Sequence, residues 1–204
     1  MNYIILAILY SLSGFLMKFS DDEYDEKSNK IIAVIIGVIC GITIALLASN
    51  NVDASYIFIG ILVGTALSFK IDGIHHIATL LVFLALYIIW GIFNPNGSIL
   101  ANLSLITLLI CIFSAFIDEI GNDNETIYKR SKFFKFFFDY RFTMKIAILL
   151  LAILGYYQSI TGFSIPYVGF LSFSTFIFFI LFELSYELAN LVFSKYFLNQ
   201  KNHI

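Results

Sequence analysis

Carboxylates and histidines recur at a spacing of four residues beside the apolar segments of this chain. The pairs are Asp21/Asp25, Asp22/Glu26, Asp72/His76, Asp118/Asn122 and Glu183/Glu187. Residues four apart lie on the same face of a helix, so each pair can point two ligand atoms in one direction. Carboxylate oxygens bind hard divalent cations, and imidazole nitrogens add zinc, iron and manganese to the choice. The pattern therefore predicts metal-dependent chemistry near helix ends.

Four of these residues are the predicted ligands of a divalent metal, which would be Mg, Mn or Zn. An exposed carboxylate at a helix C-terminus interacts unfavourably with the negative end of the helix dipole, at a cost of about 0.3–1 kcal/mol. A cation bound between carboxylates at neighbouring helix ends would remove this repulsion. We expect the ligands to be Asp72, His76, Asp118 and Glu183. His76 is favoured over His75 because neighbouring residues on a helix point in different directions, so at most one would join the Asp72 face.

The predicted catalytic residues are the carboxylates closest to the apolar segments. Asp72 and Asp118 directly follow such segments, and Glu183 and Glu187 fall within the last one. An unpaired charge at the edge of the membrane or within it is costly, so an ionisable residue at such a position is interpreted as functional. We therefore expect catalytic roles for Asp72, Asp118, Glu183 and Glu187. Nearby cations could clamp an anionic head group, and the expected anion-binding residues are Lys70, Lys129 and Arg130.

The acidic run from Asp21 to Glu26 is interpreted differently. Runs of charge usually mark solvated segments. Lys18, Lys27 and Lys30 lie close enough in the sequence to pair with this run. We expect it to be a solvated face that takes no part in the site.

The composition identifies the class of protein that must position these residues. Hydrophobic residues make up 60% of the chain and charged residues 13%, whereas a soluble domain carries about 25% charged residues. The mean hydropathy is +0.90. A membrane-spanning helix needs ~20 apolar residues, and ~17 can suffice. Seven segments meet or approach this length, at residues 3–19, 31–49, 55–70, 74–93, 99–117, 142–161 and 166–188.

The twelve Lys and Arg residues occupy alternate gaps between these segments. Basic residues near span ends are retained on the cytoplasmic side of a membrane. The distribution predicts an all-α, polytopic protein of the cell membrane, in which residues 1–204 form one seven-helix domain with its N-terminus outside and its C-terminus inside. The segment at 55–70 is the weakest, and a re-entrant hairpin is the alternative there. Two spans are favoured, because losing one would put the later basic loops on the opposite side from the first.

The long gap at residues 118–141 mixes basic and aromatic residues in its second half. Lys132, Lys135 and Asp139 fall at i, i+3 and i+7, which leaves a face of phenylalanine. This pattern predicts a helix lying in the cytoplasmic interface, with its cations toward anionic head groups. The alternative is that the stretch simply begins the sixth span.

Several function classes lack their sequence signature. The sequence contains no Walker loop, no GxSxG elbow, no HExxH and no dinucleotide-binding fingerprint. Its net charge of −2 gives no basis for a nucleic-acid partner. The favoured function is a metal-dependent membrane enzyme that acts at the cytoplasmic face on a phosphorylated or isoprenoid lipid. The alternatives are a cation- or proton-coupled transporter with Glu183 and Glu187 as its relay, and a non-catalytic membrane subunit.

Overall fold

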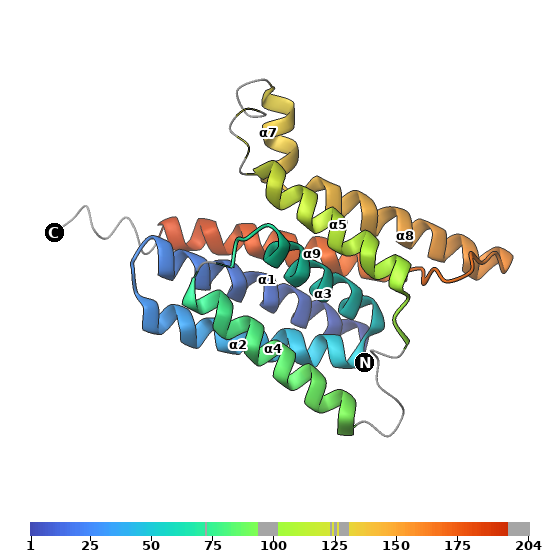
Figure 1. Cartoon of the computed structure of the whole chain (residues 1–204), viewed down its shortest axis with the longest axis horizontal. Coiled ribbons are helices and arrows are strands. Elements are labelled where there is room, and N and C mark those ends of the chain that lie inside the picture. The colour runs from blue at the N-terminus through green and yellow to red at the C-terminus, as the bar shows by residue number, and fades with distance from the viewer. Residues whose placement is uncertain (72, 94–101, 123, 125, 127–130, 196–204) are drawn as a thin grey trace. The chain divides into compact units, whose positions relative to one another are not determined.

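The computed structural model describes residues 1–71, 73–93, 102–122, 124, 126 and 131–195. These residues are predominantly helical and contain no strand (Figure 1). The fold class predicted from composition is therefore confirmed as all-helical. The main helices are α1 (Tyr3–Asp25), α2 (Lys30–Asn50), α3 (Val52–Leu67), α4 (Ile74–Phe93), α5 (Leu105–Asn122), α7 (Lys132–Asp139), α8 (Phe142–Thr161) and α9 (Phe173–Phe193).

Six helices of the described residues are long and apolar enough to cross a membrane, namely α1, α2, α4, α5, α8 and α9. The helix α3 is apolar but has only 16 residues. At about 1.5 Å per residue it extends about 24 Å, which is short of a bilayer core about 30 Å thick. The six helices make this a multi-pass membrane protein, and a seventh span through α3 stays a prediction.

Two of the predicted spans end too early, because their helices continue through the acidic residues that follow. The helix α1 runs on to Asp25, and α5 runs on to Asn122. As a result Asp21, Asp118 and Glu119 all lie on helices. The four-residue spacing of these acids therefore keeps the geometric meaning that a helix gives it.

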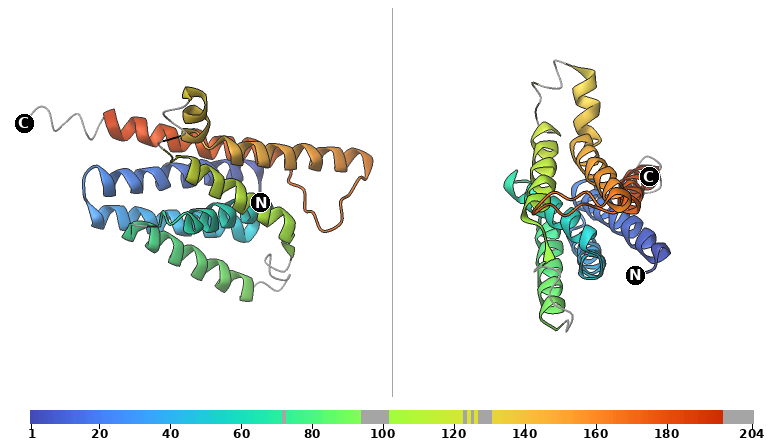
Figure 2. Two further views of the ribbon diagram at one scale, coloured as in Figure 1. Left: turned by 45° about the horizontal axis from the view of Figure 1, so that its top comes forward. Right: turned by 90° about the vertical axis from the view of Figure 1, so that its right-hand side faces the viewer.

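The predicted start of the last span, at residue 166, is wrong. The helix α8 ends at Gly162, whose φ of 72° is the left-handed conformation that glycine adopts without strain. The chain then continues without regular helix until α9 begins at Phe173, as the orange loop of Figure 2 shows. The predicted spans left a gap only at residues 162–165. Hydropathy could not extend it to residue 172, because residues 167–171 are themselves largely apolar.

The chain divides into two compact units. Unit 1 comprises Met1–Asn50, Asp72–Ser98 and Phe178–Ile204, and unit 2 comprises Asn51–Ile71 and Ile99–Ile177. Unit 1 thus contains α1, α2, α4 and most of α9. Unit 2 contains α3, α5, α7, α8 and the first turn of α9.

In unit 1, α2 and α4 touch through two glycines four residues apart. A Cβ atom at Gly37 would lie 2.7 Å from Thr79 Oγ1 and 2.9 Å from the His75 carbonyl oxygen, and one at Gly41 would lie 2.7 Å from the Thr79 carbonyl oxygen. These distances are too short for any real Cβ contact, so only glycine allows the two helices to approach this closely. The Thr79 hydroxyl also donates a 2.9 Å hydrogen bond to the Gly37 carbonyl.

In unit 2, α3 and α5 pack by the same means. A Cβ atom at Gly60 would lie 2.7 Å from the Cys111 Cβ, and one at Gly64 would lie 2.7 Å from the Ala115 Cβ. Both cysteines of the chain, Cys40 and Cys111, are buried free thiols. They thus act as small apolar residues of the core.

The loop between α8 and α9 is tied to the starts of α3 and α5 by hydrogen bonds. Asp53 accepts from the Ser172 backbone N–H at 2.8 Å and from the Thr175 hydroxyl at 2.7 Å. The Thr107 hydroxyl donates to the Gly169 carbonyl at 2.7 Å and accepts from the Gly169 N–H at 2.9 Å. Helical hydrogen bonds are missing in this loop, so side chains of α3 and α5 satisfy its backbone instead.

Replacing Gly41 by Leu should destabilise the protein by about 1–3 kcal/mol, because the new side chain would overpack against the α4 backbone. Thermal unfolding in detergent should show a midpoint lower by several degrees, at about 2–4 °C per kcal/mol. The matched control is Ala85→Leu on the exposed surface of α4. An equal loss in both variants would contradict a close contact at Gly41.

Candidate metal centre

The end of α1 and the first turn of α4 are brought together by α2. The Ser20 hydroxyl of α1 donates to the Ala33 carbonyl of α2 at 2.8 Å. One turn further along α2, the contacts at Gly37 fix the positions of Thr79 and of the His75 backbone. Because α2 contacts both α1 and α4 at short range, Asp21 and the first residues of α4 occupy defined positions.

Three potential metal ligands meet at this place. His75 Nε2 lies 3.2 Å from Asp21 Oδ1, and His76 Nε2 lies 3.8 Å from the same oxygen. One ligand atom from each residue lies within 4.8 Å of the others, and this is the metal-compatible group of the described residues. The two imidazole rings have their centroids 4.0 Å apart. We call Asp21, His75 and His76 the Asp–His–His cluster.

The spacing within the Asp–His–His cluster fits a small divalent cation. Two ligand atoms that are each about 2.1 Å from a tetrahedral ion lie about 3.4 Å apart. The distances of 3.2 and 3.8 Å lie on either side of this value. Two imidazoles and one carboxylate suit zinc or iron better than magnesium, which prefers an all-oxygen shell. Three protein ligands also leave coordination positions for water or a substrate atom.

His75 is deeply buried and closely packed. Its side chain is 3% exposed, and its ring lies tilted against the Tyr24 ring with centroids 4.4 Å apart. Its Nδ1 is buried without a hydrogen-bond partner in the described structure, which costs about 1–3 kcal/mol. A Cβ atom at Gly73 would overlap this Nδ1, so the glycine leaves room for the ring. The Nε2 atom that faces Asp21 is the one available to an ion, and Nδ1 is on the other side of the ring.

The carboxylate of Asp21 has further polar neighbours on α1 and α9. The Tyr186 hydroxyl lies 3.5 Å from Asp21 Oδ2, and the Lys18 ammonium lies 5.6 Å from the centre of the Tyr186 ring. Lys18 also pairs with Asp22 at 2.9 Å. Such outer contacts orient a ligating carboxylate, since they occupy the oxygen that faces away from the histidines.

The interpretation of residues 21–26 as a solvated run is wrong for its first three members. Asp22 is 5% exposed and Glu23 is 3% exposed, and Asp21 faces the two histidines. The helix α1 continues to Asp25 and turns these residues toward α4 and α9 instead of water. The predicted pairing with lysines is confirmed, because Lys18 binds Asp22 and Lys27 binds Glu23 at 3.1 Å.

The expectation that at most one histidine joins the Asp72 face lies outside the described residues, but both histidines approach Asp21. His75 and His76 begin α4, and long side chains on a helix lean toward its N-terminus. Both rings can therefore bend toward the end of α1 although their Cα atoms are adjacent. Of the two, His75 lies closer to the carboxylate and is more deeply buried.

Of the other predicted ligands, Glu183 and Asp118 lie away from the Asp–His–His cluster. Asp72 is outside the described residues, as are Lys129 and Arg130. Glu183 is 9% exposed and lies near the middle of α9. Its neighbour Phe182 packs with its carbonyl oxygen directly against Gly14 of α1. Asp21 is seven residues further along α1, about 10 Å at 1.5 Å per residue. Glu183 is therefore not a member of the Asp–His–His cluster, and Glu187 is half-buried one turn beyond it.

Asp118, in unit 2, caps a helix. Its Oδ1 accepts from the Thr143 backbone N–H at 3.0 Å, and its Oδ2 accepts from the Met144 N–H at 2.7 Å. The residue at the N-cap position of α8 is Arg141, with a φ of 48°. Arginine has no acceptor for these N–H groups, so a carboxylate from α5 supplies it. The burial and the position of Asp118 are explained by this role.

Glu119 forms ion pairs with two basic side chains of unit 2. Its Oε2 lies 3.0 Å from Lys70 Nζ, and its Oε1 lies 3.4 Å from an Nη atom of Arg141. Both pairs are largely buried, as the low exposure of Glu119 shows. Lys70, predicted to bind an anion, thus already has an anionic partner within the chain. The contacts join the end of α3, α5 and the start of α8.

The sequence reasoning did not select Asp21 or His75 as ligands. They are 54 residues apart, so no local spacing connects them. A usable signal was present in Gly37 and Gly41, since glycines four apart in an apolar helix mark a close helix contact. That signal marks one face of α2 as a close contact but does not identify the partner. The fold places α4 there, and the short α1–α2 connection brings the end of α1 beside the start of α4.

The fold and the cluster define a multi-pass helical membrane protein with a candidate metal centre at the ends of two of its apolar helices. The chain matches no protein-family model, no curated protein and no solved structure.

Replacing Asp118 by Ala should lower stability by about 0.5–2 kcal/mol, because two N–H groups at the start of α8 would lose their acceptor. Asp118→Asn, which keeps one acceptor oxygen, should lose less. Thermal unfolding in detergent measures both, with Asp139→Ala on the exposed surface of α7 as the control. Unchanged stability together with loss of bound metal would instead support the predicted ligand role of Asp118.

Proposed function

We propose that this protein binds a divalent transition-metal ion at Asp21, His75 and His76 and uses it as a membrane enzyme on the phosphorylated head group of a lipid. The observation that carries the proposal is the convergence of three ligand atoms from α1 and α4 within 4.8 Å. Acids and histidines rarely gather in this way in an apolar helical protein without a function.

The position of the cluster supports a substrate at the membrane boundary. Asp21 lies in the last turns of α1, and His75 lies in the first turn of α4. Both helices are long enough to cross a bilayer, so their ends lie near the depth of lipid head groups. The His76 side chain is 32% exposed, which leaves one side of the cluster accessible. A lipid could thus present its head group to the metal while its chains stay in the membrane.

In this proposal each residue has a defined task. Asp21 and the two histidines hold the ion, and Tyr186 orients Asp21 from the far side, with Lys18 over the Tyr186 ring. When bound, such an ion polarises a phosphoryl oxygen or activates a water molecule. Tyr24 packs on His75 and limits the movement of its ring.

A transporter is the second candidate, and the burial of Glu183 favours it. Glu183 lies in the middle of α9, a candidate span, and carboxylates at that depth commonly form ion or proton relays. A non-catalytic subunit is the third candidate, and no contact of the described residues favours it specifically.

We expect purified wild-type protein to contain about one zinc or iron ion per chain, a stoichiometry set by a single three-ligand cluster. Elemental analysis after detergent extraction would measure this. His75→Ala and Asp21→Asn should each reduce the metal content at least tenfold, because two ligands rarely retain a divalent ion. The control is His203→Ala, which changes the third histidine of the chain.

Assays of phosphate release and of proton flux distinguish the proposed enzyme from the alternative transporter. Release of inorganic phosphate from lipid phosphates or diphosphates should depend on added metal and be lost in His75→Ala. If His75→Ala retains full metal content, the proposed centre is incorrect. If the metal is lost but the only measurable activity is proton flux in proteoliposomes, abolished by Glu183→Gln, the protein is a transporter.

We also propose that α3 is a seventh span and that the N-terminus lies outside the cell membrane. The alternating distribution of Lys and Arg supports this orientation. In a variant with Cys40 and Cys111 replaced by Ala, single cysteines at Asn2 and Asn51 should react with an impermeant maleimide in intact cells. One at Ser28 should react only after lysis. Labelling of Ser28 in intact cells would reverse the orientation.

A further inference from the structure

We infer that α7 is a membrane-interface helix that binds an anionic lipid leaflet, with its phenylalanines among the acyl chains and its lysines at the head groups. The inference concerns unit 2 and is independent of the metal centre proposed for unit 1. Its support is the place of α7 in the chain, the exposure of its side chains and its charge.

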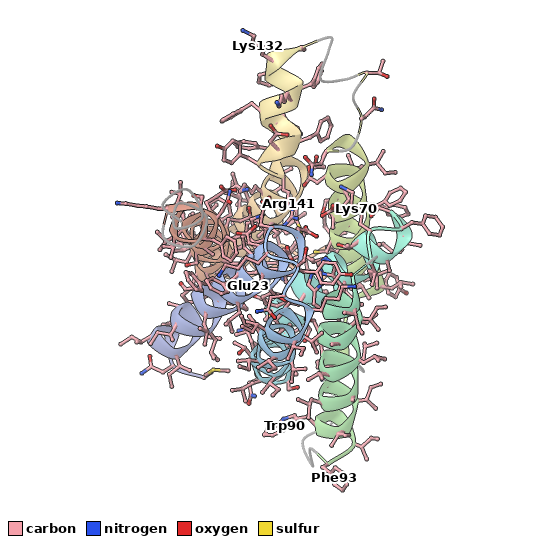
Figure 3. All side chains as sticks on the ribbon, turned by 90° about the vertical axis from the view of Figure 1, so that its left-hand side faces the viewer. Glu23, Lys70, Trp90, Phe93, Lys132 and Arg141 are labelled. Atoms are coloured by element: carbon pink, nitrogen blue, oxygen red, sulfur yellow. The ribbon has the colours of Figure 1, made fainter. Side chains whose placement is uncertain are left out.

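The first support is that α7 ends directly before a candidate membrane span. The helix α7 covers Lys132–Asp139, and α8 begins at Phe142, so only Tyr140 and Arg141 separate them. In Figure 3, Lys132 lies at the far end of α7 and Arg141 lies at the end where α8 begins. The start of α8 must lie near the membrane boundary if α8 spans the membrane, and the short connection keeps the end of α7 there too.

The second support is the uneven burial of its five phenylalanines. Phe133, Phe134 and Phe136 are 67%, 49% and 54% exposed. The other two pack on the protein: the Phe138 ring covers Gly121 of α5, and the Phe137 ring stacks on Phe142 of α8 with centroids 5.6 Å apart. The helix is thus anchored along one side. Phe133, Phe134 and Phe136 still expose about half or more of their surface, although the Phe136 ring also contacts Tyr140 and Phe142.

The third support is charge. Residues 131–145 contain four basic side chains, Lys132, Lys135, Arg141 and Lys145, and one acidic side chain, Asp139. Arg141 pairs with Glu119, whereas Lys132 and Lys135 project from the exposed polar face of α7. The surface is therefore locally positive although the whole chain has a net charge of −2. A positive strip beside an aromatic face is the pattern of helices that lie on anionic membranes.

The lipid surface explains both faces of α7 at once. Exposed phenylalanine would be unfavourable in water, and lysine would be unfavourable in the bilayer core, but the interface accommodates each at its own depth. Each lysine near an anionic surface contributes about 1 kcal/mol, which corresponds to about a fivefold preference for anionic over neutral lipid. An apolar protein partner would satisfy the phenylalanines but give the lysines no comparable role.

The experiment uses the full-length protein in bilayers with a tryptophan placed at residue 133. Trp90, the one native tryptophan, is first replaced by Phe, and Phe133→Trp is added as the reporter. Fluorescence quenching is then compared between bilayers that contain brominated phosphatidylglycerol and bilayers that contain the same fraction of brominated phosphatidylcholine. Ile153→Trp, on the exposed surface of α8, is the reference reporter and should be quenched equally by both lipids.

The expected result is strong quenching of the residue 133 reporter, with apparent binding of the anionic lipid severalfold tighter than that of the neutral lipid. Lys132→Gln together with Lys135→Gln should abolish the preference and leave the reference reporter unchanged. Equal quenching by both lipids in the parent protein would overturn the anionic preference. Absence of quenching by either lipid would overturn the membrane contact, and a Phe136→Trp reporter would test it again if Phe133→Trp does not fold.

Discussion

The close contact of α2 with α4 at Gly37 and Gly41 is the constraint on which unit 1 depends. At these two positions the α4 backbone and Thr79 occupy the space that a side chain would need. Packed helices in a membrane gain little from the hydrophobic effect, so close backbone approach and interhelical hydrogen bonds hold them together. The bond from Thr79 to the Gly37 carbonyl is of this kind. Because the His75 carbonyl is part of the same contact, the first turn of α4 cannot shift without breaking it.

The two units satisfy their acidic helix ends in different ways. In unit 1 the carboxylate of Asp21 faces two imidazoles, which are also metal ligands. In unit 2 the carboxylates of Asp118 and Glu119 are satisfied by backbone N–H groups and by the cations Lys70 and Arg141. A buried charge is costly unless it is paired, so each acid needs such an arrangement. Only in unit 1 does the arrangement of the described residues leave ligand atoms that an ion could share.

The chemistry that we propose and the contact that we infer for α7 both belong to the boundary of the membrane. There an ion can meet a phosphorylated head group, and lysine and phenylalanine can lie close together at different depths. The cluster at the ends of α1 and α4 and the aromatic helix before α8 are each positioned by the ends of candidate spans. The apolar spans thus determine where the polar chemistry of this protein takes place.

The sequence by itself determined the helical class, the membrane setting and most helix positions. Runs of apolar residues near twenty long have few alternatives, which is why α4 at 74–93 and α8 at 142–161 were predicted at their observed bounds. The amphipathic spacing of lysine and phenylalanine likewise predicted a helix where α7 lies. The end of α8 before Gly162 was predicted, but the loop that follows continues to residue 172 instead of 165, because hydropathy does not distinguish an apolar loop from an apolar helix.

Only the tertiary structure decided which acids belong together. Asp118 was expected at the metal and caps α8, whereas Asp21 was expected in water and faces His75 and His76. These residues look alike in sequence, since each ends an apolar segment at a helical spacing. What separates them is the neighbour that packing brings to each carboxylate, which depends on contacts between helices far apart in the chain. Spacing along one helix gives the direction of a side chain, but it carries no information about the helix that side chain will meet.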